Sequence, residues 1–195
     1  MSQQTKFLPG DPQPDKIIQQ MLRVNQAGEY GAERIYSGQL FCLELKSAPA
    51  AEIELIQNMY NQELVHLAYF NQAIPRFRTR PTLLQPLWYL GGWALGFITA
   101  LRGNAAGMVC TEAVETVIDQ HYSTQLEYLA NTTMPQDLNS FATELKQKIE
   151  LFRAEEIEHK NIAIQNGGSE NNQFRLLNWV IMGITKIAIA IAKKI

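Results

Sequence analysis

Two short motifs in this sequence pair a glutamate with a histidine three residues later. They run from Glu63 to His66 and from Glu156 to His159, and they contain two of the three histidines in the chain. On an α-helix this spacing places both side chains on one face, about one turn apart, so that both can reach one metal ion. A single such motif is more typical of a solvated helix face.

Further glutamates extend these motifs into a repeated pattern. A bundle that holds two metal ions needs one more carboxylate from each of two other helices. Glu29 and Glu33, one turn apart, precede the first motif, and Glu112 and Glu115 precede the second. The spacing alone does not choose within either pair. The chain nevertheless reads twice as a single glutamate followed by Glu-x-x-His, and this repetition favours a metal site.

Four carboxylates and two imidazoles form a donor set suited to two divalent cations. Buried glutamates without a compensating charge would be very costly, whereas two dications would offset four carboxylates. Oxygen and imidazole ligands suit iron or manganese better than a metal that prefers thiolates, and they leave coordination positions open for O2. The pattern therefore predicts a site for two iron or manganese ions in the interior of a helical bundle.

Other residues near these motifs are weaker candidates. His121 has no glutamate three residues before it, and we do not expect it to be a ligand. Tyr122 follows Glu115 by seven residues and shares its helix face, so it is either a hydrogen-bonding or electron-transfer group beside the ligands or an ordinary core tyrosine. We expect Glu155 and Glu158 to face solvent or to lie behind the ligands.

The elements that must position these residues are long helices. Apolar residues recur at helical spacing, and proline and glycine separate the segments. We expect helices at about 15–46, 50–74, 104–131 and 135–167, with Pro75 ending the second and Gly167-Gly168 ending the fourth. One long connection, 75–103, joins the second to the third. This order predicts an all-α, ferritin-like four-helix bundle with one long crossover.

The domain organisation follows from these elements. We expect a flexible lead-in at 1–14, where proline is frequent, a bundle at 15–168 that includes a hydrophobic connection at 81–101, and an amphipathic helix at 169–195. The segment 81–101 has no charged residue and several aromatic ones, but Pro86 and Gly91-Gly92 interrupt it. Both hydrophobic segments are either buried accessory helices or helices on a membrane surface, and neither is expected to span it.

Composition excludes several other classes of protein. The chain has 195 residues, of which 46% are hydrophobic and 18% charged, which is typical of a folded domain. A net charge of −2 argues against a nucleic-acid-binding face. Cys42 and Cys110 are too few for a disulfide framework, fit a reducing compartment and are expected to be small buried residues. The sequence contains no glycine-rich phosphate loop, no G-x-S-x-G and no C-x-x-C.

Several of these segments together resemble the demethoxyubiquinone hydroxylases, the di-iron monooxygenases of late ubiquinone biosynthesis. The similarity begins after about Asp15 and covers nearly the whole remaining chain in order. Its motifs are Asn25–Ala32 with Arg34–Tyr36, Gln62–His66, Arg78–Pro81 with Pro86–Trp88, Cys110–Glu115, His121-Tyr122 and Phe152–His159. One departure is Gln26, where many members of that family have histidine, at a position that is not an expected ligand.

The resemblance implies a di-iron site and chooses among the open glutamates. Glu29 and Glu115 would be the single carboxylates, Glu63/His66 and Glu156/His159 the paired ligands, and Glu63 and Glu156 the bridges. The implied reaction hydroxylates the ring of a polyprenylated demethoxyubiquinol with O2 as cosubstrate. Its electrons would come from NADH, a reductase or the quinol itself.

The resemblance also implies a location and partners. It favours membrane contact through 81–101, and 174–195 is expected to lie on the membrane surface as well. The N-terminal residues do not resemble a transit peptide, which favours the cytoplasmic side of a bacterial inner membrane. Other ubiquinone-biosynthesis proteins are candidate partners, and no nucleic acid is expected. The competing hypotheses are another di-metal bundle, such as a ferroxidase, a manganese catalase or an RNA hydroxylase, and a helical membrane-surface scaffold with solvated glutamates. Stoichiometric metal would exclude the scaffold.

Overall fold

The computed structural model describes residues 13–168 and 172–195, and every element in these ranges is helical. In chain order the elements are α1 (Pro14–Leu45), α2 (Ala50–Arg76), α3 (Gln85–Leu101), α4 (Asn104–Asn131), α5 (Gln136–Gln165), the 3-10 turn η1 (Asn172–Phe174) and α6 (Arg175–Ala192). The predictions of an all-α chain and of four long helices are confirmed. Residues 1–12 of the expected lead-in and residues 169–171 lie outside the described residues.

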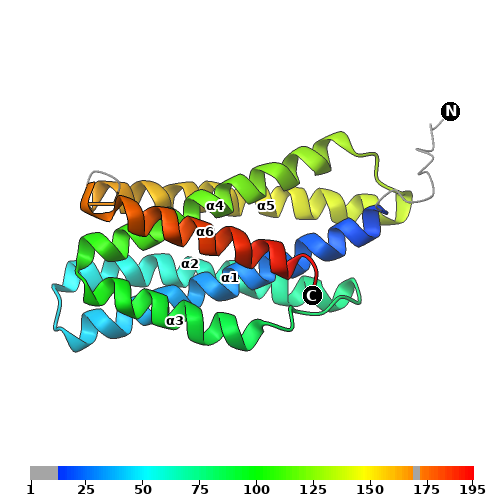
Figure 1. The fold of residues 1–195 in the computed structure, drawn as a ribbon. Helices are drawn as coiled ribbons and strands as arrows, with labels where there is room; N and C mark the ends of the chain where they lie inside the picture. The colour runs from blue at the N-terminus through cyan, green and yellow to red at the C-terminus, as the bar shows by residue number, and fades with distance from the viewer. Residues whose placement is uncertain (1–12, 169–171) are drawn as a thin grey trace.

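The four long helices form an elongated bundle (Figure 1). Helices α1 and α2 pack as one hairpin, and α4 and α5 as another. The crossover from α2 to α4 holds α3, which packs against α1 and α4, while α6 packs mainly against α4 and also touches α1. This is the single-crossover topology of a ferritin-like bundle, with α3 and α6 as the predicted hydrophobic accessory helices.

Some helix boundaries differ from their predictions. The helix expected at 169–195 is α6, Arg175–Ala192, and the turn η1 precedes it. Pro75 does not end α2 but lies in its last turn, and the helix continues to Arg76. A proline removes one backbone donor, yet its fixed φ is compatible with a helix, so the last turn can form with one hydrogen bond fewer. The chain leaves the helix at Phe77, whose N–H donates to the carbonyl of Ile74 at 3.3 Å.

The predicted stop after the fourth helix is confirmed. Helix α5 ends at Gln165, and Gly167 follows with a φ of +101°, a conformation that favours glycine. The N–H of Gly168 then donates to the carbonyl of Ala163 at 3.0 Å, which satisfies one of the carbonyls left open at the helix end.

Helices α1 and α3 meet through glycines. A Cβ on Gly38 would lie 2.1 Å from the carbonyl oxygen of Trp93, and a Cβ on Gly96 would lie 1.9 Å from that of Ile35. A side chain at either position would overlap the opposite backbone. Because glycine has none, the two helix backbones can touch. The contact holds α3 against the helix that carries Glu29.

Candidate metal centre

The six predicted ligands lie together inside the bundle. Each is at most 3% exposed. They form two groups, and within each group the possible ligand atoms lie within 4.8 Å of one another. The first group is Glu29, Glu63, His66 and Glu156, and the second is Glu63, Glu115, Glu156 and His159. Helices α1, α2, α4 and α5 therefore all contribute to one buried cluster.

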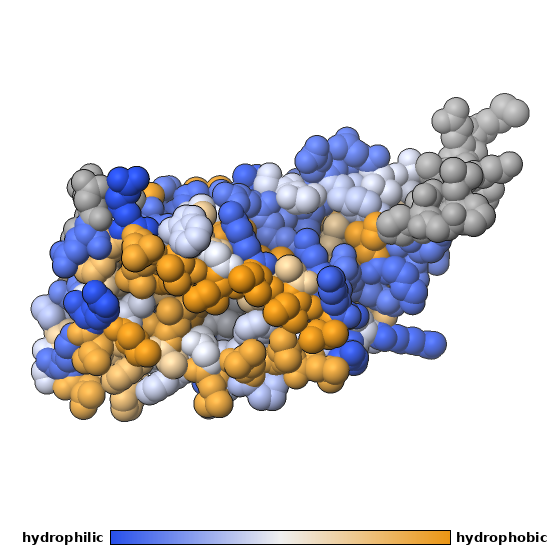
Figure 2. Space-filling view, in the orientation of Figure 1, coloured by the Kyte–Doolittle hydropathy of each residue, from blue (hydrophilic) through white to orange (hydrophobic). Residues whose placement is uncertain are grey.

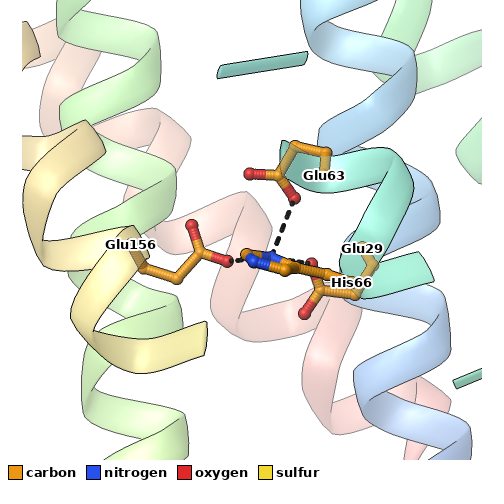
Figure 3. A group of neighbouring side chains, drawn as sticks. All are labelled: Glu29, Glu63, His66 and Glu156. Atoms are coloured by element: carbon orange, nitrogen blue, oxygen red, sulfur yellow. Dashed lines mark hydrogen bonds and ion pairs between the residues drawn. The ribbon is translucent and has the colours of Figure 1, made fainter. Parts of the chain in front are cut away.

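Glu63 and Glu156 belong to both groups. Glu156 places Oε1 3.1 Å from Nδ1 of His66 and Oε2 3.2 Å from Nδ1 of His159. Glu63 lies between the same two nitrogens, with Oε2 3.9 Å from His66 and Oε1 3.2 Å from His159. Figure 3 shows Glu63, Glu156 and Glu29 converging on the His66 ring. Each shared carboxylate thus faces both histidines, as a bridging ligand must.

The polar atoms of the cluster are suited to bind a metal cation. Among the described residues, no hydrogen-bond partner reaches either carboxylate oxygen of Glu63, Oε2 of Glu156 or Nδ1 of His159, although all four atoms are buried. Buried polar atoms without partners are costly, and metal coordination would satisfy these. The donor set of carboxylates and imidazoles suits iron or manganese.

Burial and mutual repulsion shift the pKa values of the glutamates in the cluster. Burial raises the pKa of Glu63 well above its usual range, and the neighbouring Glu156 adds to the shift. Burial and Glu156 raise the pKa of Glu115 in the same way. Burial also acts to raise the pKa of Glu156, but the rings of His159 and His66, whose Nδ1 atoms lie 3.2 and 3.1 Å from its oxygens, outweigh it and lower the value to about 2. Glu63 and Glu115 therefore favour the neutral form unless a cation lies nearby.

Two tyrosines hold the single glutamates. The hydroxyl of Tyr122 donates a hydrogen bond to Oε1 of Glu29, and that of Tyr36 donates to Oε1 of Glu115 at 2.9 Å. Both tyrosines are 1% exposed. The placement of Tyr122 beside the ligands agrees with the first of its two interpretations. Tyr36 was not among the predicted site residues, although it follows Glu29 by seven residues, just as Tyr122 follows Glu115.

The glutamates that spacing left as alternatives lie elsewhere. Glu33 is buried but pairs with Arg34 and accepts a hydrogen bond from the hydroxyl of Tyr60 at 3.0 Å. Glu112 is also buried and faces the end of α5, where a Cβ on Gly168 would lie 2.5 Å from its Oε2. Neither belongs to the two groups of possible ligands.

His121 lies outside the cluster, as expected for a residue that is not a ligand. Its Nε2 lies 2.7 Å from Nε2 of Gln125, which also bonds Asn25. Burial, with a smaller contribution from Lys193, lowers the pKa of His121 to about 4, so its ring is neutral near pH 7.

Two residues behind the histidines complete the site. Nε2 of His66 lies 2.5 Å from Oε2 of Glu155, and Nε2 of His159 lies 2.6 Å from Oε1 of Gln62. For Glu155 the sequence analysis left a solvent-facing position and a position behind the ligands open, and the structure shows the latter. Gln62 was named only as the first residue of the Gln62–His66 motif, and no role was predicted for it. Each of them directly precedes the glutamate of a Glu-x-x-His pair, which is a signal present in the sequence.

An apolar cavity approaches the cluster from one side. Its volume is about 490 Å³, and its walls come from α1, α3, α4 and α6. A smaller cavity shares Gly28 and Ile118 with it and extends to Glu29 and Tyr122. Apolar space therefore lies between the accessory helices and the Glu29 side of the cluster.

The sequence is similar to a defined set of proteins. Residues 16–192 match the family model described as ubiquinone biosynthesis protein COQ7. A relative from Rhodospirillum rubrum, named 3-demethoxyubiquinol 3-hydroxylase, is 43% identical over 96% of this chain and 83% of its own length. The human mitochondrial NADPH-dependent 3-demethoxyubiquinone 3-hydroxylase is 39% identical over 91% and 78% of the two chains. The mitochondrial 5-demethoxyubiquinone hydroxylase of Saccharomyces cerevisiae is 36% identical over 92% and 78%.

Proposed function

The chain belongs to the COQ7 family of ubiquinone biosynthesis proteins, and on this premise we propose that it is a di-iron monooxygenase that hydroxylates the ring of a polyprenylated demethoxyubiquinol. The observation that carries the proposal is the pair of shared carboxylates, Glu63 and Glu156, each of which faces both histidines. We assign Glu29, His66 and the two shared glutamates to one iron, and Glu115, His159 and the same two glutamates to the other. When bound, the iron ions supply the activation of O2, of which one atom enters the ring and the other leaves as water.

The residues of the chain orient this site and exclude water from it. Tyr122 and Tyr36 fix the carboxylates of Glu29 and Glu115 by hydrogen bonds. His121, which is neutral, remains outside and keeps a hydrogen bond with Gln125. The buried ring of Phe152 packs against His66, and a dry site strengthens every electrostatic contact within it.

We assign the apolar cavity to the quinol substrate. A polyprenyl tail has no polar group, and the cavity walls, which include Ile35, Leu95 and Ile184, match that chemistry. The smaller cavity, of about 10 Å³, lies between this space and the Glu29 side of the cluster and is too small to hold the ring itself. Two electrons per turnover are required, and we propose a reduced nicotinamide nucleotide as the donor, in line with the printed name of the human relative.

We further propose that the protein is peripheral to a membrane, on the cytoplasmic face of a bacterial inner membrane. Large apolar side chains of α3 and α6 are exposed and gather on one face of the molecule (Figure 2). Among the described residues, α6 alone has the length and composition to cross a membrane. Its Lys186 and the adjacent Lys193 and Lys194 favour a helix that lies in the interface near anionic lipid.

A labelling experiment tests the reaction. The iron-loaded protein, in lipid vesicles that contain demethoxyubiquinol, receives isotopically labelled O2 and either NADH or NADPH. We expect a hydroxylated quinone that carries one labelled oxygen atom. Oxidation of ferrous iron by O2 without label in the quinone would contradict the proposal and indicate a ferroxidase.

A further inference from the structure

The polar contacts around the metal centre follow an approximate twofold pattern. Glu29 and Tyr36 stand seven residues apart on α1, and Glu115 and Tyr122 stand seven apart on α4. Each tyrosine bonds the glutamate of the other helix, since Tyr36 donates to Glu115 and Tyr122 donates to Glu29. The two halves of the chain therefore support each other's single carboxylates in the same way.

The histidines follow the same reciprocal rule. Gln62 directly precedes Glu63 on α2, yet its Oε1 accepts from His159 on α5. Glu155 directly precedes Glu156 on α5, yet its Oε2 accepts from His66 on α2. In both rings Nε2 is held from outside, so a ring that binds a metal through Nδ1 would keep its proton on Nε2.

The pattern is broken at one pair of equivalent positions. The ring of His66 donates to a carboxylate, whereas the ring of His159 donates to an amide. A carboxylate acceptor withdraws the imidazole proton more strongly than an amide does, and so makes the opposite nitrogen a stronger donor to a metal. The His66 ring also packs against Phe152, with ring centroids 4.1 Å apart, which limits its rotation.

We propose that Glu155 and Gln62 are positioning residues that make the two metal positions unequal, so that the position at His66 and Glu29 binds a divalent cation more tightly than the position at His159 and Glu115. This inference rests on the proposed function only in that the cluster holds two metals. It requires no statement about substrate or turnover.

Calorimetric titration of the metal-free, full-length protein with Mn²⁺ tests the proposal, because Mn²⁺ suits the same ligands as ferrous iron. We expect two binding steps that differ at least about tenfold in affinity. Glu155→Gln should weaken the tighter step about tenfold and leave the weaker step in place. Gln62→Glu should strengthen the weaker step, so the test does not depend on a single variant that could fail to fold.

Ligand variants place each step at its position. Glu29→Ala should remove the tighter step, and Glu115→Ala the weaker one. Glu158→Gln, on the same helix as Glu155 but exposed, is the matched control and should change neither step. The electron paramagnetic resonance spectrum of the first equivalent should be that of an isolated Mn²⁺ ion, and a coupled pair should appear only with the second.

The outcomes separate the inference from the proposed function. Two steps of equal affinity in the unmodified protein would overturn the inference alone. Equal weakening of both steps by Glu155→Gln, as expected if Glu155 only stabilises the fold, would also overturn it. A complete failure to bind Mn²⁺ would overturn both the inference and the di-metal assignment.

Discussion

The centre of the bundle buries charged side chains, whereas its outer face on α3 and α6 exposes large apolar ones. In the centre, four glutamates and two histidines are almost wholly buried. On the outer face, Leu90, Leu176 and Trp179 are 68%, 72% and 74% exposed. Globular proteins ordinarily bury large apolar groups and leave carboxylates in water.

The two regions also differ in how closely they specify what they bind. In the centre, carboxylate and imidazole atoms converge from four helices, so the loss of one group removes part of a defined site. The outer face offers apolar area without convergent polar atoms, which suits lipid and predicts graded effects. Effects of substitution should therefore be abrupt at the centre and incremental at the surface.

The largest effect is expected from Glu156→Ala. This change removes a carboxylate that faces both histidines, so it should leave one bound iron ion or none and lower hydroxylation by more than about 100-fold, beyond the range typical of groups behind a ligand. Metal analysis and the hydroxylation assay would measure it. Glu158→Ala, two residues away on the exposed face of α5, should leave both unchanged. Similar losses in the two variants would remove the distinction between centre and surface.

A smaller, graded effect is expected from Leu176→Glu on α6. Transfer of a leucine side chain from water into an apolar environment is favourable by about 1.5–3 kcal/mol. The charged variant loses this contribution and should bind lipid vesicles at least about tenfold more weakly. Flotation with vesicles would measure the change. Leu151→Glu on α5, an exposed leucine outside the proposed membrane face, is the control, and an equal loss there would argue against a defined membrane face.

The contact between α1 and α3 links the two regions, and Gly96→Ala should strain it. The new Cβ would lie 1.9 Å from the carbonyl oxygen of Ile35, so the helices must separate at a cost of about 1–3 kcal/mol in the free energy of unfolding. Gly91→Ala, where nothing lies within 4 Å of the new Cβ, should be neutral or slightly stabilising. Chemical denaturation of both variants would show whether the contact stabilises the fold, and equal stabilities would show that it does not.

The smallest effect is expected for charges outside the centre. Asp119 on α4 accepts from Nε of Arg153 at 2.7 Å and from Nζ of Lys160 at 3.2 Å, both on α5. Partial burial acts to raise the pKa of Asp119, but these two hydrogen bonds outweigh it and lower the pKa below 3.8. Because the folded-state pKa is lowered, the stabilisation is present above about pH 4 and is lost as pH falls through the folded value.

Asp119→Asn should therefore cost about 0.5–1 kcal/mol in the free energy of unfolding near neutral pH and progressively less in acid. Urea denaturation of both proteins at a series of pH values would measure this. A cost that stays constant down to pH 3 would show that the carboxylate charge is not its source.

Much of the fold follows from local signals in the sequence. Proline and glycine delimit the long helices closely, and the Glu-x-x-His spacing predicts which faces point inward. Pro75 placed the predicted helix end two residues early, because a proline near a helix end costs only one hydrogen bond. Whether 81–101 is buried or exposed was not decidable, since α3 is both: Gly96 and Ala100 face α1 and α4, while Leu90 and Ile98 face outward.

The contacts across the centre were less accessible to sequence reasoning. Glu29 and Glu33 are both buried, so burial alone could not separate them, and the resemblance to a known family was needed. Tyr36 repeats the seven-residue spacing of Tyr122 but was missed, because spacing along one helix does not reveal which group on another helix it meets. The same is true of Glu155 and Gln62, whose partners are on the opposite hairpin.

Iron content per chain tests the central claim most directly. The protein would be loaded with ferrous iron without oxygen, freed of unbound metal and analysed for iron and protein together. We expect two iron ions per chain, and one or none in both Glu63→Ala and Glu156→Ala, because each of these glutamates faces both histidines. An iron-free protein, or two iron ions retained in both variants, would contradict it.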